Sequence, residues 1–166
     1  MDLVTRCYTR RAAAKTQSVE KINLLLSHET AWLNSQNRNG VAPIHIAATK
    51  KCSDALKLLM SHPECEVNMR TRLRLTALHI AAHRGRIDNV NELLSHPQID
   101  CNAMDLNGDT AAHHAAANGH QDILCLIAEC GRFWVPYLKN KSKKRLIKRA
   151  KSTLRCYDQC STDKHQ

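Results

Sequence analysis

The strongest constraint in this sequence is an internal repeat of 34 residues. One marker is a segment that contains a histidine and ends in two alanines, found at 42–48, 76–82 and 110–116. Two further markers keep the same step: a Ser-His pair that begins at 27, 61 and 95, and an asparagine at 34, 68 and 102. A unit of this size cannot bury its apolar face alone, so the period predicts small units stacked side by side around one shared core.

Each period is predicted to contain a turn, a short helix, a second turn, a second helix and a loop. Asn-Gly pairs at 39–40 and 107–108 indicate tight turns, because glycine readily adopts a positive φ. Thr76 and Thr110 are expected to cap the first helix through their hydroxyl groups. The second helix carries apolar residues at helical spacing, for example Val90, Leu93 and Leu94. Aromatic residues make up only 4% of the chain, so we expect an all-α fold of closely packed helices.

The third copy of the repeat resembles the ankyrin repeat. Its matching residues are Asp105, Gly108, Thr110, His113, Gly119 and His120. The resemblance implies an ankyrin-repeat solenoid of helix-turn-helix units with short hairpin-like turns. We expect a degenerate N-terminal capping repeat at 1–35, repeats at 36–69 and 70–103, a repeat with a C-terminal cap at 104–138, and a basic tail at 139–166. In length and architecture the chain is also similar to the inhibitors of Rel-type transcription factors.

Three positions depart from the ankyrin pattern. Arg74 replaces the turn glycine of the second full copy, and Lys51 replaces the glycine between the helices of the first. His114 stands where an apolar residue is usual, and burial without a hydrogen-bond partner would make it destabilising. Each departure is expected to weaken one copy locally without removing the periodicity.

The ankyrin resemblance implies that turn tips and first-helix residues along a concave face contact a protein partner. The candidate protein-binding residues are Arg38, Asn39, Lys50, Arg70, Arg72, Leu73, Arg74, His83, Arg84, Met104, Leu106 and Asn107. The middle copy gathers five arginines, at 70, 72, 74, 84 and 86. Because the arginine fork binds carboxylates through two hydrogen bonds, this cluster predicts an acidic partner. The alternative is a solvated basic face.

The net charge of +10 is concentrated at the C-terminus, where residues 139–155 include nine basic residues and no acidic one. The densest part comprises Lys143, Lys144, Arg145, Lys148 and Arg149. Such density is typical of a nuclear-import or anion-binding segment. Two other interpretations stay open: an amphipathic helix for calmodulin or an acidic membrane surface, and a C-terminal cap with a solvated outer face. The alternative function is therefore nucleic-acid or acidic-surface binding through the tail, with the repeats as a docking platform.

Catalytic motifs are missing from the sequence. It has no phosphate-binding glycine loop, no Gly-x-Ser-x-Gly and no His-Glu-x-x-His, so we predict a non-enzyme without a cofactor. The periodic histidines are expected to be structural, and Cys156, Cys160 and His165 form only part of a zinc site, so no metal is predicted. No apolar run reaches the roughly 18 residues that span a bilayer. We expect a cytoplasmic or nuclear protein, or one found in both.

Overall fold

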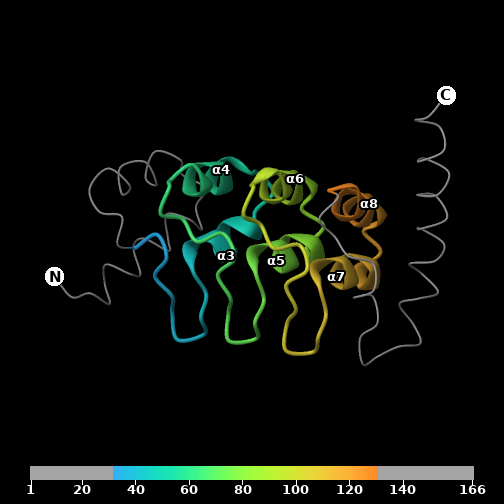
Figure 1. The fold of residues 1–166 in the computed structure, drawn as a ribbon, viewed down its shortest axis with the longest axis horizontal. Helices are drawn as coiled ribbons and strands as arrows, with labels where there is room; N and C mark the ends of the chain where they lie inside the picture. Colours follow the sequence, from blue (N-terminus) through green and yellow to red (C-terminus); the bar gives the residue numbers. More distant parts are fainter. Residues whose placement is uncertain (1–31, 131–166) are drawn as a thin grey trace.

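A computed structural model of the chain describes residues 32–130. This part of the chain contains six helices and no strand. The helices are α3 (Pro43–Ala48), α4 (Asp54–Met60), α5 (Ala77–His83), α6 (Ile87–Ser95), α7 (Ala111–Asn118) and α8 (Gln121–Glu129). In Figure 1, α3, α5 and α7 form one row, α4, α6 and α8 form a second row, and the loops between copies extend to one side. The predicted all-α stack of helical hairpins is confirmed.

The first helix of each copy begins with a bond between the backbone and a histidine ring. His45, His79 and His113 each accept the backbone N–H of the residue three positions earlier on Nδ1, at 3.0, 3.2 and 3.1 Å. The backbone N–H of His79 also donates to the Thr76 hydroxyl at 3.5 Å, which confirms the predicted role of Thr76 as a helix cap. Because Nδ1 accepts, a neutral ring carries its proton on Nε2.

The Nε2 atom of these histidines ties one copy to the next. His45 Nε2 donates to Met69 O at 3.0 Å and lies 3.2 Å from Leu75 O, and His79 Nε2 donates to Asp109 O at 3.1 Å. Within residues 32–130, the buried Nε2 of His113 has no partner. The two complete bridges confirm the predicted structural role, since both nitrogens of His45 and His79 are used inside the fold.

The loops are joined to one another along the stack. The Asn34 side chain donates to Glu64 O at 2.7 Å and accepts from Glu66 N at 3.0 Å. The Asn68 side chain repeats this pattern one copy later, with Gln98 O at 2.7 Å and Asp100 N at 2.8 Å. These bonds explain the periodic asparagines and hold successive loops in one row.

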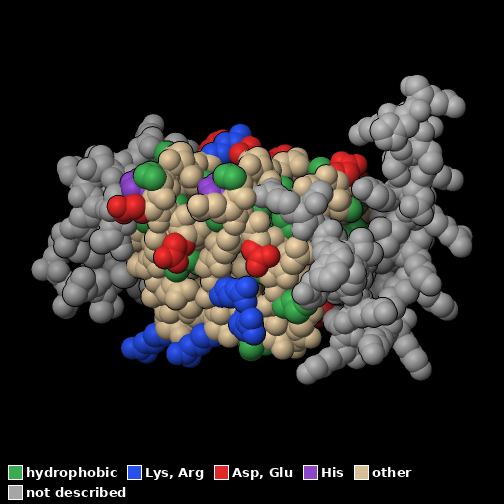
Figure 2. Space-filling view, in the orientation of Figure 1, with side chains coloured by type: hydrophobic (Ala, Val, Ile, Leu, Met, Phe, Trp, Pro, Cys, Tyr) green, Lys and Arg blue, Asp and Glu red, His purple; other side chains and the backbone are tan. Residues whose placement is uncertain are grey.

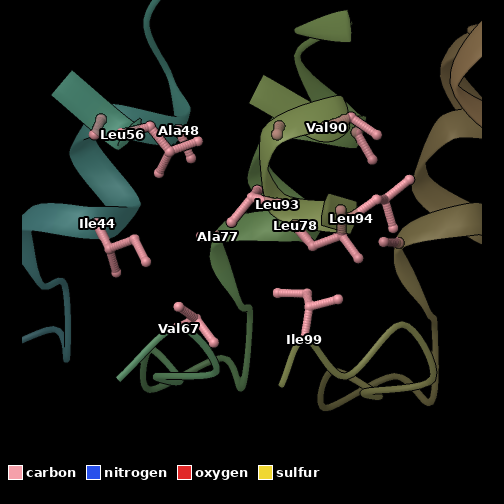
Figure 3. Packing of buried hydrophobic residues seen from close by; sticks show 14 of the residues in the cluster. Ile44, Ala48, Leu56, Val67, Ala77, Leu78, Val90, Leu93, Leu94 and Ile99 are labelled. Atoms are coloured by element: carbon pink, nitrogen blue, oxygen red, sulfur yellow. The ribbon is translucent and has the colours of Figure 1, made fainter. Parts of the chain in front are cut away.

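The core lies between the two rows of helices and extends along the loops, as Figure 3 shows for residues such as Ile44, Leu56, Leu78 and Leu93. Buried alanine pairs in the first helices allow neighbouring copies to approach closely. Asn89 is also fully buried, and its side-chain amide donates to three carbonyls of the preceding copy, at 2.8 to 3.4 Å. The helix rows therefore share one continuous buried core, from which the loops extend.

The tips of the loops share a left-handed backbone position. Gly40, Arg74 and Gly108 occupy equivalent places one period apart, with φ of 72°, 59° and 79°. Arg74 thus adopts the conformation of the glycine that it replaces. Among the described residues it is the one non-glycine residue with positive φ, so the predicted local weakening has a physical basis in backbone strain.

Candidate functional site

The loop tips form an exposed strip of mixed apolar and basic character, here called the tip strip. It comprises Arg38, Arg72, Leu73, Arg74 and Leu106, all of them exposed. Leu73 and Leu106 are 60% and 61% exposed, and Leu106 N–H donates to Leu73 O at 3.1 Å. Figure 2 shows Lys and Arg side chains gathered along the edge that the loop tips form in Figure 1. The tip strip therefore combines two neighbouring leucines with three arginines.

A groove lies beside the first helices and crosses three successive copies, with a volume of about 690 Å³. We call it the inner groove. Its lining residues are Val41, His45, Ile46, Thr49, Lys50, Leu75, His79, Ile80, His83, Arg84 and His114. The lining is apolar with basic residues and histidines, and it contains no Asp or Glu.

His114 has a partner, so the cost considered for this departure from the ankyrin pattern is reduced. Its Nε2 lies 3.0 Å from Oδ2 of the buried Asp105. Its ring makes edge contacts with His79 and His83, at centroid distances of 5.5 and 5.7 Å. Burial opposes ionisation of Asp105, but hydrogen bonds from Asp109 N–H, His114 and Asn107 N–H outweigh it and lower the pKa of its carboxyl group.

Burial favours the neutral form of three histidines of the inner groove, His45, His79 and His83. Burial lowers the pKa of His79 to about 4 and also lowers the pKa of His45. Burial, followed by the nearby His114 and Arg84, lowers the pKa of the more exposed His83. The Asn118 amide donates to His83 Nδ1 at 3.1 Å, which leaves Nε2 as the donor of the neutral ring.

Most of the predicted binding residues fall into one of these two surfaces. Lys50, His83 and Arg84 line the inner groove. Arg38, Arg72, Leu73, Arg74 and Leu106 form the tip strip, and Asn39 and Asn107 are exposed beside them.

Three residues of the predicted surface are placed differently. Arg70 is half-buried and forms an ion pair with Asp100 at 3.8 Å. Met104 is half-buried and belongs to neither surface. Arg86, grouped with the arginine cluster from the sequence, donates to Thr49 O at 3.1 Å and joins two copies. The cluster therefore divides into exposed tip arginines and arginines engaged within the fold.

The lining residues of the inner groove that were not among the candidate binding residues include Ile46, Ile80 and His114. Ile46 and Ile80 follow the periodic histidines directly and are one period apart. They are half-buried, and Ile80 packs against the core on one side. The signal available in the sequence is an apolar residue repeated in register on the helix that carries the histidine.

Several predictions concern residues outside the described range. They include the basic residues Lys143, Lys144, Arg145, Lys148 and Arg149 and the partial zinc motif after residue 155. Between residues 32 and 130, no group of three or more His, Cys, Asp or Glu is arranged to hold a metal ion. The helices of that same range are too short or too polar to cross a membrane.

The described part of the chain is an array of helical hairpins. A histidine ring bonds to the backbone at the start of each first helix, and hydrogen bonds join successive copies and successive loops. Two family models for ankyrin repeats match the chain, one of three copies at 63–135 and one of many copies at 25–81. The chain belongs to the ankyrin-repeat family. No curated protein sequence matches it, so this assignment depends on the repeat models. Ankyrin repeats are generally protein-protein interaction modules and are typically non-enzymatic.

Proposed function

We propose that this protein is a non-enzymatic interaction module whose tip strip binds an acidic protein partner. The observation that carries the proposal is the pair Leu73 and Leu106. Both are more than half exposed, and they lie on adjacent tips joined by a backbone hydrogen bond. Neighbouring exposed leucines supply apolar area that water solvates poorly, and burying it against a partner stabilises the complex.

The arginines of the tip strip favour a partner of negative charge. Arg38, Arg72 and Arg74 are exposed beside the leucines. A guanidinium group binds a carboxylate through two parallel hydrogen bonds, and arginine is enriched at interface hot spots. Exposed charge pairs contribute more to association rate and specificity than to affinity, whereas the leucines contribute mainly to the lifetime of the complex.

The test uses the full chain as bait, with captured proteins identified by mass spectrometry and the affinity of a purified partner then measured by calorimetry. Arg72→Glu and Leu73→Ala are each expected to weaken binding by about tenfold. The matched control is Lys51→Glu, a charge reversal at an exposed residue that belongs to neither surface. The proposal would be refuted if the partner bound the wild-type protein and both tip variants with equal affinity.

A second candidate function is nucleic-acid or acidic-surface binding through residues 139–155, where nine basic residues occur without an acidic one. Its signature is an affinity that falls steeply with salt and depends little on base sequence. Deleting residues 139–166 separates the two candidates: binding of mixed-sequence RNA or DNA is expected to vanish, whereas the partner of the tip strip is retained. Persistent nucleic-acid binding by the shortened chain would exclude the tail as its source.

We further propose that the protein acts as a regulator of signalling or transcription, with nuclear entry directed by the run Lys143, Lys144 and Arg145. A fluorescent fusion is expected to accumulate in the nucleus and to leave it when these three residues are neutralised. A fusion that stays cytosolic in both forms would eliminate the nuclear role.

A further inference from the structure

Two cysteines, one before and one after the hairpin of α7 and α8, bring their sulfur atoms together. Cys101 lies on the loop between α6 and α7, and Cys130 is the C-cap residue of α8. Their Sγ atoms are 3.5 Å apart, although 29 positions separate the two residues in the sequence. Both side chains are thiols in the structure.

The backbone around each cysteine is fixed by hydrogen bonds. Next to Cys101, the Asp100 N–H donates to Asn68 Oδ1 at 2.8 Å, which ties this loop to the preceding one. The Cys130 N–H donates to Leu126 O at 3.2 Å and so continues the hydrogen bonds of α8. The distance between the sulfur atoms is therefore set by the packing of the loop beside the end of α8.

The two thiols differ in their exposure to solvent. Cys101 is a core residue with 2% of its surface exposed, whereas Cys130 is half-buried. A disulfide needs about 2.05 Å between its sulfur atoms, so the pair has to close by about 1.5 Å, which rotation about the Cα–Cβ bonds can supply. The Cys130 thiol also donates to Ile127 O at 2.9 Å, but a thiol is a weak donor and the loss of this bond costs little.

Stacking of the repeat does not require a thiol at either position. The equivalent positions one period earlier are occupied by Val67 and His96. Val67 is as deeply buried as Cys101, with 2% of its surface exposed, so the core accepts an aliphatic side chain at this place. The two cysteines therefore need an explanation other than packing.

We propose that Cys101 and Cys130 form a peroxide-sensitive pair that oxidises reversibly to a disulfide. The sulfur of the half-buried Cys130 attacks one oxygen of hydrogen peroxide, the O–O bond breaks, and the second oxygen leaves as water with the thiol proton. The product is a sulfenic acid on Cys130. The Cys101 sulfur then attacks the sulfenic sulfur, the S–O bond breaks, and a second water leaves with the Cys101 proton. Two thiols and one peroxide thus give one disulfide and two waters, and a dithiol reductant reverses the reaction by exchange.

The disulfide closes a loop that contains all of α7 and α8. Such a cross-link restricts the unfolded chain, so it stabilises the hairpin at the end of the described stack against local unfolding. Oxidation is therefore expected to change the stability of this hairpin without changing the arrangement of the helices.

The first test maps the disulfide in the full chain by mass spectrometry. The protein is treated with one equivalent of hydrogen peroxide, its remaining thiols are blocked with N-ethylmaleimide, and it is digested with trypsin and a protease that cuts before aspartate. The expected product is a disulfide between peptides 100–104 and 122–132, with fragmentation that locates the bond at Cys130 and not at Cys125. Treatment with dithiothreitol is expected to separate the two peptides. A bond from Cys101 to any other cysteine, or a Cys101 that is still alkylated after oxidation, would overturn the proposal.

The second test compares the thermal unfolding of the oxidised and reduced chains. The oxidised wild type is expected to melt about 5–10 °C above the reduced form. Cys101→Val, which copies the residue of the preceding copy, and Cys130→Ser are each expected to lose this difference. The matched control is Cys65→Val, because burial raises the pKa of the Cys65 thiol to about 11 and leaves it a poor nucleophile. This control is expected to keep both the disulfide and the shift in Tm. A difference in Tm that persists in Cys101→Val and Cys130→Ser would show that the pair is not its source and contradict the proposal.

Discussion

Arg74 at the middle loop tip provides a test that separates stability from binding. Its φ of 59° lies in the left-handed region that glycine occupies at the equivalent positions 40 and 108. Strain of this kind persists where another property of the side chain is useful. The exposed Arg74 side chain belongs to the tip strip, so Arg74→Gly should relieve strain and remove a binding group at once.

The size of the stability effect follows from two opposing terms. A residue with a Cβ costs about 1–2 kcal/mol in the left-handed region. Glycine lowers the free energy of unfolding by about 0.5–1 kcal/mol, because it gives the unfolded chain extra conformational freedom. The free energy of unfolding is therefore expected to rise by about 0.5–1 kcal/mol, which corresponds to about 1–4 °C in Tm for a chain of this size.

The assay is urea unfolding followed by circular dichroism, together with calorimetry against the captured partner. Arg74→Gly is expected to raise the unfolding midpoint without changing the m-value and to weaken partner binding. The control is Arg72→Gly, because Arg72 is an exposed neighbour without positive φ; this variant is expected to lose about 0.5–1 kcal/mol of stability. If both glycine variants lower stability equally, the strain argument is wrong.

Three further predictions concern the fold. Gly40→Ala should destabilise more than Gly108→Ala in urea unfolding, since a Cβ at Gly40 would lie 2.8 Å from Arg72 N and nothing lies within 4 Å at Gly108; equal losses would contradict the close packing of the tips. Asn89→Ala should cost about 2–3 kcal/mol in thermal unfolding, because buried carbonyls lose their donor; a loss under about 0.5 kcal/mol would show that those bonds matter little. Stability should fall as the pH drops from 6.5 towards 4, since burial lowers the pKa of His79 to about 4 and the unfolded chain then binds more protons than the folded one. At about 1.4 kcal/mol per pKa unit, protonation of His79 accounts for a loss of about 3 kcal/mol in the free energy of unfolding. A urea midpoint that stays constant over this pH range would contradict a neutral His79 ring in the folded chain.

The fold followed from the sequence because the period places chemically identical residues in identical positions. Once His45 and His79 are one period apart, a stack makes their environments equivalent. In the structure each ring accepts a backbone N–H on Nδ1 and contacts a carbonyl 30 residues later, of Leu75 or Asp109, through Nε2. The exposed tips were predicted for the same reason: an Asn-Gly turn in two copies locates the equivalent turn around Arg74 in the third.

The difference between the exposed arginines and those bonded within the fold could not be predicted from the sequence. Arg70 is paired with Asp100, which lies 30 residues away on the next loop of the stack. The same separation of 30 joins the side chain of Asn34 to Glu64 and that of Asn68 to Gln98. It also joins the ring of His45 to Leu75 and that of His79 to Asp109. This spacing reflects the contact between a loop and its neighbour in the stack, which has no signature within a single copy.

The apolar groove residues Ile46 and Ile80 escaped prediction for a different reason. An apolar residue after the periodic histidine fits the core pattern of a helix as well as it fits a groove. Ile46 and Ile80 are distinguished only by being half-buried, and that depends on where the loops stand relative to the helices. Surface chemistry was therefore predictable at the tips, where exposure is certain, and unpredictable where two elements enclose a space.

The most direct test of the binding surface is hydrogen–deuterium exchange of the full chain with and without its captured partner. Slower exchange is predicted at the loop tips, residues 70–75 and 104–109, where Arg72 N–H and Leu106 N–H already connect neighbouring tips. Protection confined to the outer row of helices, α4, α6 and α8, would contradict the account and place the partner on the opposite side of the stack.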